Sequence, residues 1–409
     1  MESARTFQNP PCEGGSRRHH FLGIPPELRL VIYEIYLDDH RRVHNSRQPT
    51  NRHLRLLLTC HQVYGEAREI FHRYVSLRNE REIESFLSSV ADERTAQITY
   101  ADVANDGRVE QTKASYRMPI SGLHSALWRM KRLQHLRVFH YEATPFLSLY
   151  QVSRTKWTLQ SEEAMYPGGC PAHLLSYELY VNPEAKVQLL ERIPSRGLQR
   201  LRLSGSCQLL REQQTPGLRH LTIHGVTGSY FDQRRLDDCF QGALLESFVY
   251  GMGHRLGFEI RNHHLLSLAS GSRPQHLRKL VLLGCSRLTS EVITRCLSQL
   301  NSLEYLAMSL VTVDELRHNF VAALPPTVSV FKLTVTNAWY SIPLIKEETA
   351  LCDTIENSVL VRKPSPIELR FHFRPSLMSE NGREKRWQSI AEDDNVNLVL
   401  GPWEPYETL

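Results

Sequence analysis

The sequence predicts a mixed α and β protein, in which a small all-α module precedes an irregular α/β solenoid with a parallel concave sheet. Two observations carry this prediction. Between residues 21 and 92, apolar residues are spaced as in amphipathic helices. From about residue 123 onward, an apolar pattern recurs at steps of 20 to 41 residues. Most of these steps fit arrays whose units each supply one strand and one return, and the two longest are expected to contain insertions.

Composition excludes several classes of protein. The 409 residues allow two or three domains or one elongated array, and 41% hydrophobic with 23% charged residues indicates a folded chain with a sizeable core. No run of 18 apolar residues is long enough to cross a membrane as a helix. The net charge of +5 is too diffuse to indicate a nucleic-acid partner. We therefore expect neither a membrane nor a nucleic acid as a partner.

The cysteines and the first residues bear on location. The eight cysteines include no CxxC pair, and the sequence has no Asn-x-Ser/Thr acceptor for glycosylation. Residues 1–20 are polar and carry paired prolines and paired glycines, which predicts a flexible arm without the apolar core of a secretory signal. We therefore expect reduced thiols in an intracellular protein, in the cytoplasm, the nucleus or both.

The helical module is predicted over residues 21–92. A proline pair precedes Leu28, Ile32 and Ile35, whose spacing of four and three predicts that a helix starts there. Leu57 and later apolar residues at spacings of seven, three and four predict a second helix, with its stripe packed on the first. Three helices are therefore expected, over residues 26–39, 54–75 and 80–90. Residues 40–53 and 101–118 are predicted to be loops.

The repeat array is predicted over residues 93–375. Each copy reads leucine-x-x-leucine-x-leucine, with other apolar residues sometimes in place of leucine, and buries its leucines only against neighbouring copies. Thr289 is a predicted helix cap, and Asp314 with Glu315 is predicted to start another helical return. The central residues of the eight copies are Leu136, Tyr177, Leu201, Leu221, Phe248, Leu280, Leu306 and Phe331, and a last candidate lies at Leu369.

The carboxyl-terminal segment is predicted over residues 376–409. Charged residues dominate its first half, which predicts an exposed stretch. Residues 398–403 are apolar, and the pattern leaves open whether they dock on the repeats.

Two stretches of the helical module resemble a known family. Residues 21–33 read FLGIPPELRLVIY, and residues 57–67 read LLTCHQVYGEA, followed by an Ile-Phe pair. Together they resemble the two signatures of the F-box-like domains that are abundant in filamentous fungi. The resemblance covers residues 21–75, and the loop of residues 40–53 makes this stretch longer than a standard F-box.

One repeat also resembles a known type. Residues 280–289 read LVLLGCSRLT and precede a predicted helix, which is similar to the cysteine-containing leucine-rich repeat of F-box proteins that select ubiquitylation substrates. The resemblance implies a substrate receptor of a Skp–cullin–F-box ubiquitin ligase, acting in ubiquitin-dependent protein degradation. Its helical module would bind the Skp adaptor and its repeats the target protein. The alternative is a leucine-rich-repeat interaction scaffold that recruits no adaptor.

The residues expected to bind the adaptor form a small apolar set near the start of the module. Any single one of them could instead belong to the core of a helical domain, because most apolar helix positions are structural. The predicted adaptor-binding residues are Leu22, Ile24, Pro25, Leu28, Ile32 and Leu57.

The target is expected to bind the concave face of the sheet. Residues that alternate with the buried leucines point to that face, and Glu178 is the one acidic residue among those predicted positions. A basic face favours an acidic or phosphorylated partner, although a chain of net charge +5 shows some basic excess on any face. The predicted target-binding residues are Arg137, Arg200, Arg202, His220, His224, Lys279 and Lys332.

Catalytic and metal-binding patterns are weak. Cys60 and His61 are neighbours on a predicted helix, so their side chains diverge by about 100°, and Cys60 is expected to be buried. His263 and His264 have no partner at metal-ligand spacing, and the glycines around Met252 fit a repeat turn better than a phosphate-binding loop. We expect no enzyme, no cofactor and no metal.

Overall fold

The computed structural model describes residues 21–111, 117–141, 157–159, 161–209, 213–252, 257–270, 275–312 and 315–403. The predicted arm of residues 1–20 lies outside these ranges. The chain divides into two compact units. One comprises Met1–Arg42 with Asn51–His72, and the other comprises Val43–Thr50 with Arg73–Leu409. The helical unit therefore ends at His72, whereas the predicted module extends to residue 92.

The described part of the helical unit contains two helices and two 3₁₀ turns. Their bounds are η1 (Phe21–Gly23), α1 (Pro26–His40), η2 (Arg52–Leu58) and α2 (His61–Phe71). Proline at the first position of α1 suits a helix start, because its fixed φ matches the helix and its missing N–H would have no partner there. Tyr33 and Leu37 are buried on one side of α1, and the Tyr33 ring packs edge-on against Phe71 with centroids 6.1 Å apart.

The predicted helix over residues 54–75 is wrong as one continuous element. The 3₁₀ turn η2 ends at Leu58, and Cys60 is fully extended with φ −161° and ψ 163° before α2 begins. The break re-phases the apolar positions that follow it. Tyr64, expected in the packed stripe, is therefore exposed, whereas Val63 and Ala67 are buried.

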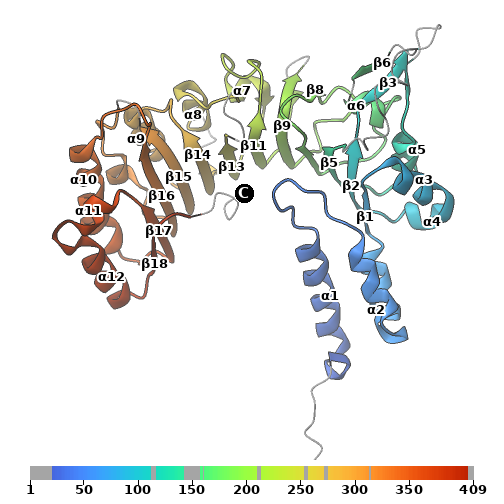
Figure 1. The fold of residues 1–409 in the computed structure, drawn as a ribbon, viewed down its shortest axis with the longest axis horizontal. Coiled ribbons are helices and arrows are strands. Elements are labelled where there is room, and N and C mark those ends of the chain that lie inside the picture. Colours follow the sequence, from blue (N-terminus) through green and yellow to red (C-terminus); the bar gives the residue numbers. More distant parts are fainter. Residues whose placement is uncertain are drawn as a thin grey trace, which may run out of the picture. The chain divides into compact units, whose positions relative to one another are not determined.

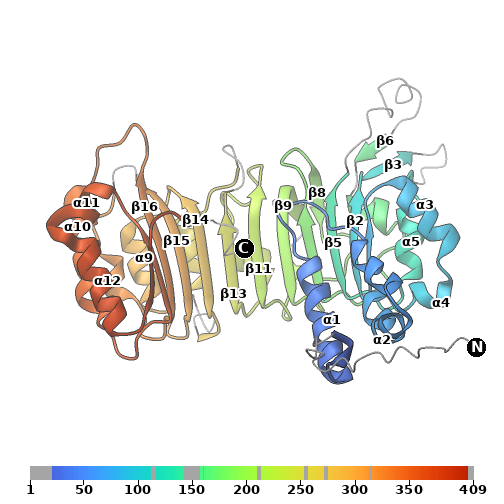
Figure 2. The same cartoon turned by 60° about the horizontal axis from the view of Figure 1, so that its bottom comes forward.

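The second unit is built on one long parallel sheet (Figures 1 and 2). Among the described residues, twelve strands pair in the order β1-β2-β5-β7-β9-β11-β13-β14-β15-β16-β17-β18, and β8 (Lys186–Leu189) adds to β9. The twelve strands are β1 (Tyr74–Leu77), β2 (Tyr100–Asn105), β5 (His135–His140), β7 (Ser176–Tyr180), β9 (Arg200–Leu209), β11 (His220–Val226), β13 (Ser247–Gly251), β14 (Lys279–Cys285), β15 (Tyr305–Thr312), β16 (Val330–Asn337), β17 (Glu368–His372) and β18 (Asn397–Leu400).

Helices and turns connect successive strands of this sheet, and in Figure 1 they follow its outer side. This mixed α/β arrangement is consistent with the predicted solenoid. Two small sheets, β4-β3-β6 and β10-β12, lie within the connections. The connecting helices and turns are α3 (Glu80–Ser89), α4 (Asp92–Thr95), α5 (Leu123–Arg129), α6 (Ser161–Met165), α7 (Leu236–Cys239), α8 (Asn262–Leu268), α9 (Ser290–Leu297), η4 (Phe320–Ala323), α10 (Ile345–Thr354), η5 (Ile355–Leu360), α11 (Pro375–Ser379), η6 (Glu380–Gly382) and α12 (Arg383–Asp393). The short strands are β3 (Arg108–Gln111), β4 (Arg117–Pro119), β6 (Trp157–Leu159), β10 (Gln213–Gln214) and β12 (Phe240–Gln241).

The core lies between the sheet and these helices. Along β14, Leu280 and Leu282 enter this core, whereas Val281 and Leu283 belong to a separate cluster on the opposite, open face. The central residues of all eight predicted copies lie in strands and are at most 1% exposed, so these strand positions are confirmed.

Four of the described strands of the main sheet were not predicted: β1, β2, β8 and β18. The predicted loop over residues 101–118 is wrong, because β2 and β3 occupy much of it. Residues 43–50 join the sheet unit by polar contacts with its first strands. Gln48 Nε2 donates to Ser76 Oγ and to the Asp102 carbonyl, both at 3.0 Å.

The two predicted helical returns have different outcomes. Thr289 caps α9 as predicted, because its Oγ1 accepts a hydrogen bond from the Val292 N–H at 3.4 Å. Glu315 instead binds the start of that same helix, accepting from the Ser290 N–H at 2.7 Å and from its Oγ at 2.8 Å. The return after Glu315 contains only the 3₁₀ turn η4, and Asp314 lies outside the described residues.

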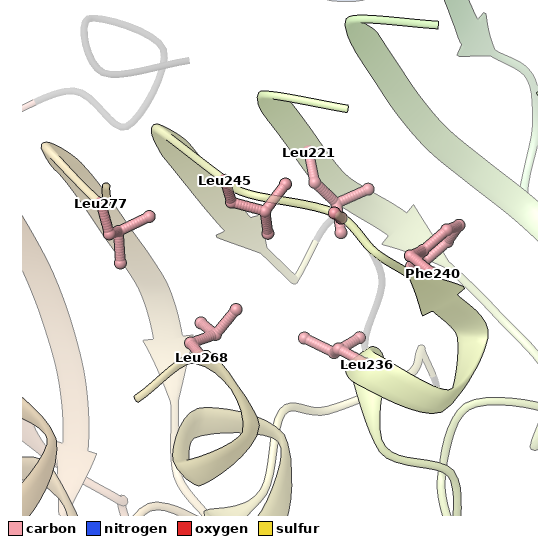
Figure 3. Close-up of a pocket in the computed structure, with 7 residues that line it drawn as sticks. Leu221, Leu236, Phe240, Leu245, Leu268 and Leu277 are labelled. Atoms are coloured by element: carbon pink, nitrogen blue, oxygen red, sulfur yellow. The ribbon is translucent and has the colours of Figure 1, made fainter. Parts of the chain in front are cut away.

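A small gap interrupts the core between β11 and β14. Its volume is about 10 Å³, and Figure 3 shows leucine and phenylalanine side chains pointing into it from strands and returns. A gap of this size holds about one water at most, and an apolar lining leaves it dry. The lining residues are Leu221, Leu236, Phe240, Ala243, Leu245, Leu268 and Leu277.

Enlarging this gap should destabilise the array strongly. Leu277 is 1% exposed, so we expect Leu277→Ala to lower the free energy of unfolding by about 2–5 kcal/mol, because a buried Leu-to-Ala change loses transfer free energy and leaves a cavity. Ile367→Ala, at a site that is 70% exposed, is the matched control and should change it by less than about 0.5 kcal/mol. Urea unfolding measures both, and equal midpoints would contradict the packing described here.

Candidate functional site

The first candidate surface is one side of α1. Leu28, Val31, Ile32 and Ile35 are 55%, 51%, 39% and 62% exposed. At 100° per residue, these four and Tyr36 span an arc of about 140°, opposite the buried Arg29, Tyr33 and Leu37. We call Leu28, Val31, Ile32, Ile35 and Tyr36 the apolar α1 face. Large exposed apolar patches of this kind mark interaction sites.

The structure divides the predicted adaptor-binding residues. Leu22, Leu28 and Ile32 are exposed, Pro25 is also exposed, and Ile24 is half-buried. Leu57 is a correction: it is 7% exposed and belongs to the core of the helical unit. Its neighbour Leu58 is 84% exposed, because η2 turns Leu57 inward and Leu58 outward.

An ion pair between the two helices supports this surface. Arg29 Nε and Nη2 donate to the two carboxylate oxygens of Glu66 at 2.9 and 2.6 Å, and Tyr33 Oη donates to Glu66 at 3.2 Å. The same guanidinium donates through Nη1 to the carbonyls of Leu22, at 3.0 Å, and of Ile24. One arginine therefore holds the segment before α1 against both helices. Arginine suits this role because its planar fork binds carboxylates bidentately.

This ion pair should give the helical unit an acid-sensitive stability. The Arg29 guanidinium holds the pKa of the Glu66 carboxyl at about 2, below its ordinary 4.5, although burial opposes the shift. A depressed folded-state pKa stabilises the fold above pH 4.5, and that contribution is lost as the pH falls toward 2. Glu66→Gln should therefore make the stability of the helical unit less dependent on pH between about 4.5 and 2. Hydrogen-exchange protection of α1 and α2, corrected for intrinsic rates at pH 6 and pH 3, measures it. The same acid loss in wild type and Glu66→Gln would contradict the assignment.

The second candidate surface is the open face of the sheet. Parallel pairing places equivalent residues side by side, so one row across it runs Asp102, Arg137, Glu178, Arg202, Thr222, Val249, Val281, Ala307, Lys332 and Arg370. The row begins with alternating charges, becomes apolar in the middle and ends with two cations. The face is therefore not uniformly basic.

Two of the predicted target-binding residues are paired with acids in the sheet. Arg137 donates to both carboxylate oxygens of the buried Asp102, at 2.6 and 2.7 Å, and Tyr74 Oη donates to the same carboxylate at 2.7 Å. Lys332 is 4% exposed and lies 3.3 Å from Glu368. These two cations thus already have acidic partners within the sheet. The sequence does not identify Asp102 and Glu368 as the partners, because residues 101–118 are predicted to be a loop and the strand at Leu369 is only a last candidate.

The other five predicted residues come together on β9, β11 and β14. We call Arg200, Arg202, His220, His224 and Lys279 the central basic patch. Among the described residues, the positions of β9, β11, β13, β14 and β15 that point to this face include no acidic side chain. Glu246 lies just before β13, and its charge only partly opposes the lowering of the His220 pKa by burial and Arg200. Gly251 lets the patch pack closely, since a Cβ there would come 2.7 Å from His224 Cδ2.

Arg202 is the buried member of this patch. Only 8% of it is exposed, and its guanidinium stacks 4.4 Å from the centroid of the Tyr180 ring, which stacks in turn on Phe139. Its Nε is buried and has no hydrogen-bond partner within the described ranges. A buried donor without an acceptor is costly, so the site favours an incoming acceptor.

The two histidines of the patch add donors and acceptors more than charge. Burial and the nearby Arg202 lower the pKa of His224 to about 4, and burial and Arg200 lower the pKa of His220. Burial also lowers the pKa of Lys279, whose Nζ lies 5.1 Å from the centroid of the Tyr305 ring. The positive charge of the patch at neutral pH therefore comes from Arg200, Arg202 and Lys279.

An apolar cluster adjoins the central basic patch. Val249, Val281, Leu283 and Ala307 form it together with Trp403, which is 9% exposed. We call these four smaller residues the apolar socket. The question that the sequence left open is thus answered for Trp403: it docks on the repeats, on their open face.

The structure also places the residues of the weak catalytic and metal-binding patterns. Among the described residues, no group of three or more His, Cys, Asp and Glu side chains could hold a metal ion. Cys60 is exposed, which corrects the expected burial. His264 is buried and Nε2 lies 2.8 Å from the Phe231 carbonyl, a structural placement. None of the helices in the described part of the chain is long and apolar enough to cross a membrane.

A pocket of about 390 Å³ lies at the carboxyl ends of β2, β5 and β7. Its polar groups largely satisfy one another. Asn105 Nδ2 donates to the Ser161 carbonyl at 2.8 Å, and Arg108 lies 2.7 Å from Asp106. We therefore assign it no ligand.

Comparison with known proteins adds no family: no protein-family model matches this sequence, and no curated protein matches it. The function of both surfaces is therefore argued from their geometry.

The Asp102 network should be essential to the amino-terminal part of the sheet. Asp102→Ala leaves the Arg137 guanidinium without its carboxylate, and we expect a loss of about 3–5 kcal/mol in the free energy of unfolding. Glu304→Ala, which breaks an exposed pair with Arg278, is the matched control and should cost about 0–1 kcal/mol. Urea unfolding of the full chain compares them. A loss for Asp102→Ala no larger than the control's would refute the role given to this network.

Proposed function

We propose that this protein is an F-box-like substrate receptor of a Skp–cullin–F-box ubiquitin ligase. Its helical unit binds the Skp adaptor, and the open face of its leucine-rich repeats binds the target protein. The protein performs no chemistry itself and brings two partners together. The single observation that carries the proposal is the apolar α1 face.

The apolar α1 face supports adaptor binding because it is contiguous and begins within the first of the two segments that resemble F-box signatures. These residues expose apolar surface. Burying such surface against a partner is favourable by about 25 cal/mol per Å². Leu22 lies next to α1 in sequence and is held to it through Arg29. A preorganised apolar patch is what a protein partner needs, because little ordering cost remains on binding.

The open face supports the target-binding half. The central basic patch offers Arg200, which is exposed, and Arg202, whose ring stacking preorganises the guanidinium. Arginine pairs bidentately with carboxylate and phosphate groups, so an acidic or phosphorylated target segment fits this face. The patch spans neighbouring strands of one rigid sheet, which fixes the spacing of the contacts.

Adaptor binding should depend on one side of α1. We expect the full-length chain to co-purify with a Skp adaptor, and Leu28→Asp or Ile32→Asp to reduce adaptor recovery at least tenfold, because a charge in the centre of an apolar interface is strongly unfavourable. Leu30→Asp is the matched control: Leu30 is 40% exposed on the same helix but lies about 200° around it from Leu28.

The control should retain adaptor binding. If the wild-type chain recovers no adaptor, the ligase proposal fails, and the scaffold without an adaptor takes its place. If Leu30→Asp abolishes recovery as fully as Leu28→Asp does, the effect comes from unfolding of the helical unit and the assigned face is wrong.

A further inference from the structure

The open face of the sheet already holds one segment of this chain. After β18, the Gly401 N–H donates to the Phe371 carbonyl at 2.9 Å, and two residues later Trp403 covers the apolar socket. Between Leu400 and Trp403 the chain has thus passed from the edge strand β18 to strands β13, β14 and β15. The next strands of the sheet beyond β13 are β11 and β9, which carry most of the central basic patch.

The residues that follow Trp403 have the chemistry to continue along this path. Residues 404–409 lie outside the described ranges and read EPYETL, with glutamates at positions 404 and 407 and a tyrosine between them. Neighbouring strands are about 4.8 Å apart, so Arg202 on β9 lies about 10 Å from Val249 on β13, two strands away. Six extended residues span about 20 Å. The segment is long enough to reach every residue of the patch.

Charge and burial fit such an occupant. Arg202 is 8% exposed and carries a buried Nε without a partner in the described ranges, and Arg200 is exposed beside it on the same strand face. A carboxylate would supply the missing acceptor at Arg202 and an ion pair at Arg200. The Trp403 Nε1 is likewise buried without a partner within the described ranges, which shows that apolar packing holds this ring in place.

We propose that the open face binds an extended segment that carries an aromatic anchor followed by acidic residues, and that residues 401–409 of this chain are such a segment, bound in cis. Trp403 fills the apolar socket, and Glu404 and Glu407 lie on the central basic patch. A target must then displace this segment by presenting the same chemistry. This inference rests on the target-binding half of the proposed function and is independent of the adaptor.

The experiment uses a labelled peptide of residues 401–409 as the probe and full-length protein in fluorescence polarisation. We expect the peptide to bind Trp403→Ala protein at least tenfold more tightly than wild type, because the variant releases its own segment and frees the face. A peptide with Glu404→Gln and Glu407→Gln should bind the same protein at least fivefold more weakly. Adding Arg200→Glu and Arg202→Glu to the Trp403→Ala protein should abolish binding.

Matched controls separate charge from position. Arg295→Glu with Lys346→Glu makes the same charge change at exposed residues of α9 and α10, and should leave peptide binding within twofold. If the double variant is unfolded, Arg200→Glu alone still tests the role of the patch, because it changes only an exposed side chain. Equal peptide affinity for wild type and Trp403→Ala, no binding to Trp403→Ala, or no effect of Arg200→Glu would each overturn the proposal. Because the assay contains no adaptor, its outcome is separate from that of adaptor co-purification.

Discussion

In-register parallel pairing is the constraint on which the rest of the sheet unit depends. Residues at equivalent positions of successive repeats lie side by side, so together they form one row across the open face. The same pairing sends Leu280 and its counterparts into one core shared with the returns, so no repeat is stable alone. A change in register by one residue would exchange the core and the open face. Position along the row therefore decides the local chemistry.

The helical unit follows a different principle, since it is too small to rely on apolar burial alone. Arg29 occupies the buried side of α1, where a leucine would be expected, and four hydrogen bonds from its guanidinium tie the preceding segment to Glu66 on α2. Tyr33, Leu37 and Phe71 are buried beside this arginine, while other apolar residues of α1 lie outside. A helix that buries an arginine and exposes leucine and isoleucine is inverted relative to an ordinary amphipathic helix.

Much of the sheet was predictable from leucine spacing, and what was missed depends on distant partners. Leu136 and its counterparts specify strands because their period is local. Asp102 looked like a loop residue, since its partners Arg137 and Tyr74 lie 35 and 28 residues away. Leu57 is buried because the 3₁₀ turn η2 points it inward, and the spacing of the apolar residues does not reveal that turn. Trp403 could not be placed, since nothing local to an apolar stretch identifies the surface that it covers.

A segment bound in cis would lower the apparent affinity of the open face for a target. A tethered ligand is present at an effective concentration on the order of millimolar, and the short connection from β18 to Trp403 favours the upper part of that range. Even if the segment bound with a dissociation constant of about 100 µM, the face would be free only about one-tenth of the time. A target would then bind about tenfold more weakly than the bare face allows. Any change that weakens the hold of Trp403 on the apolar socket, or of acidic residues on Arg200 and Arg202, would raise target affinity without altering the target. Selectivity of the face would thus be set by competition within the chain as well as by the contacts that the target makes.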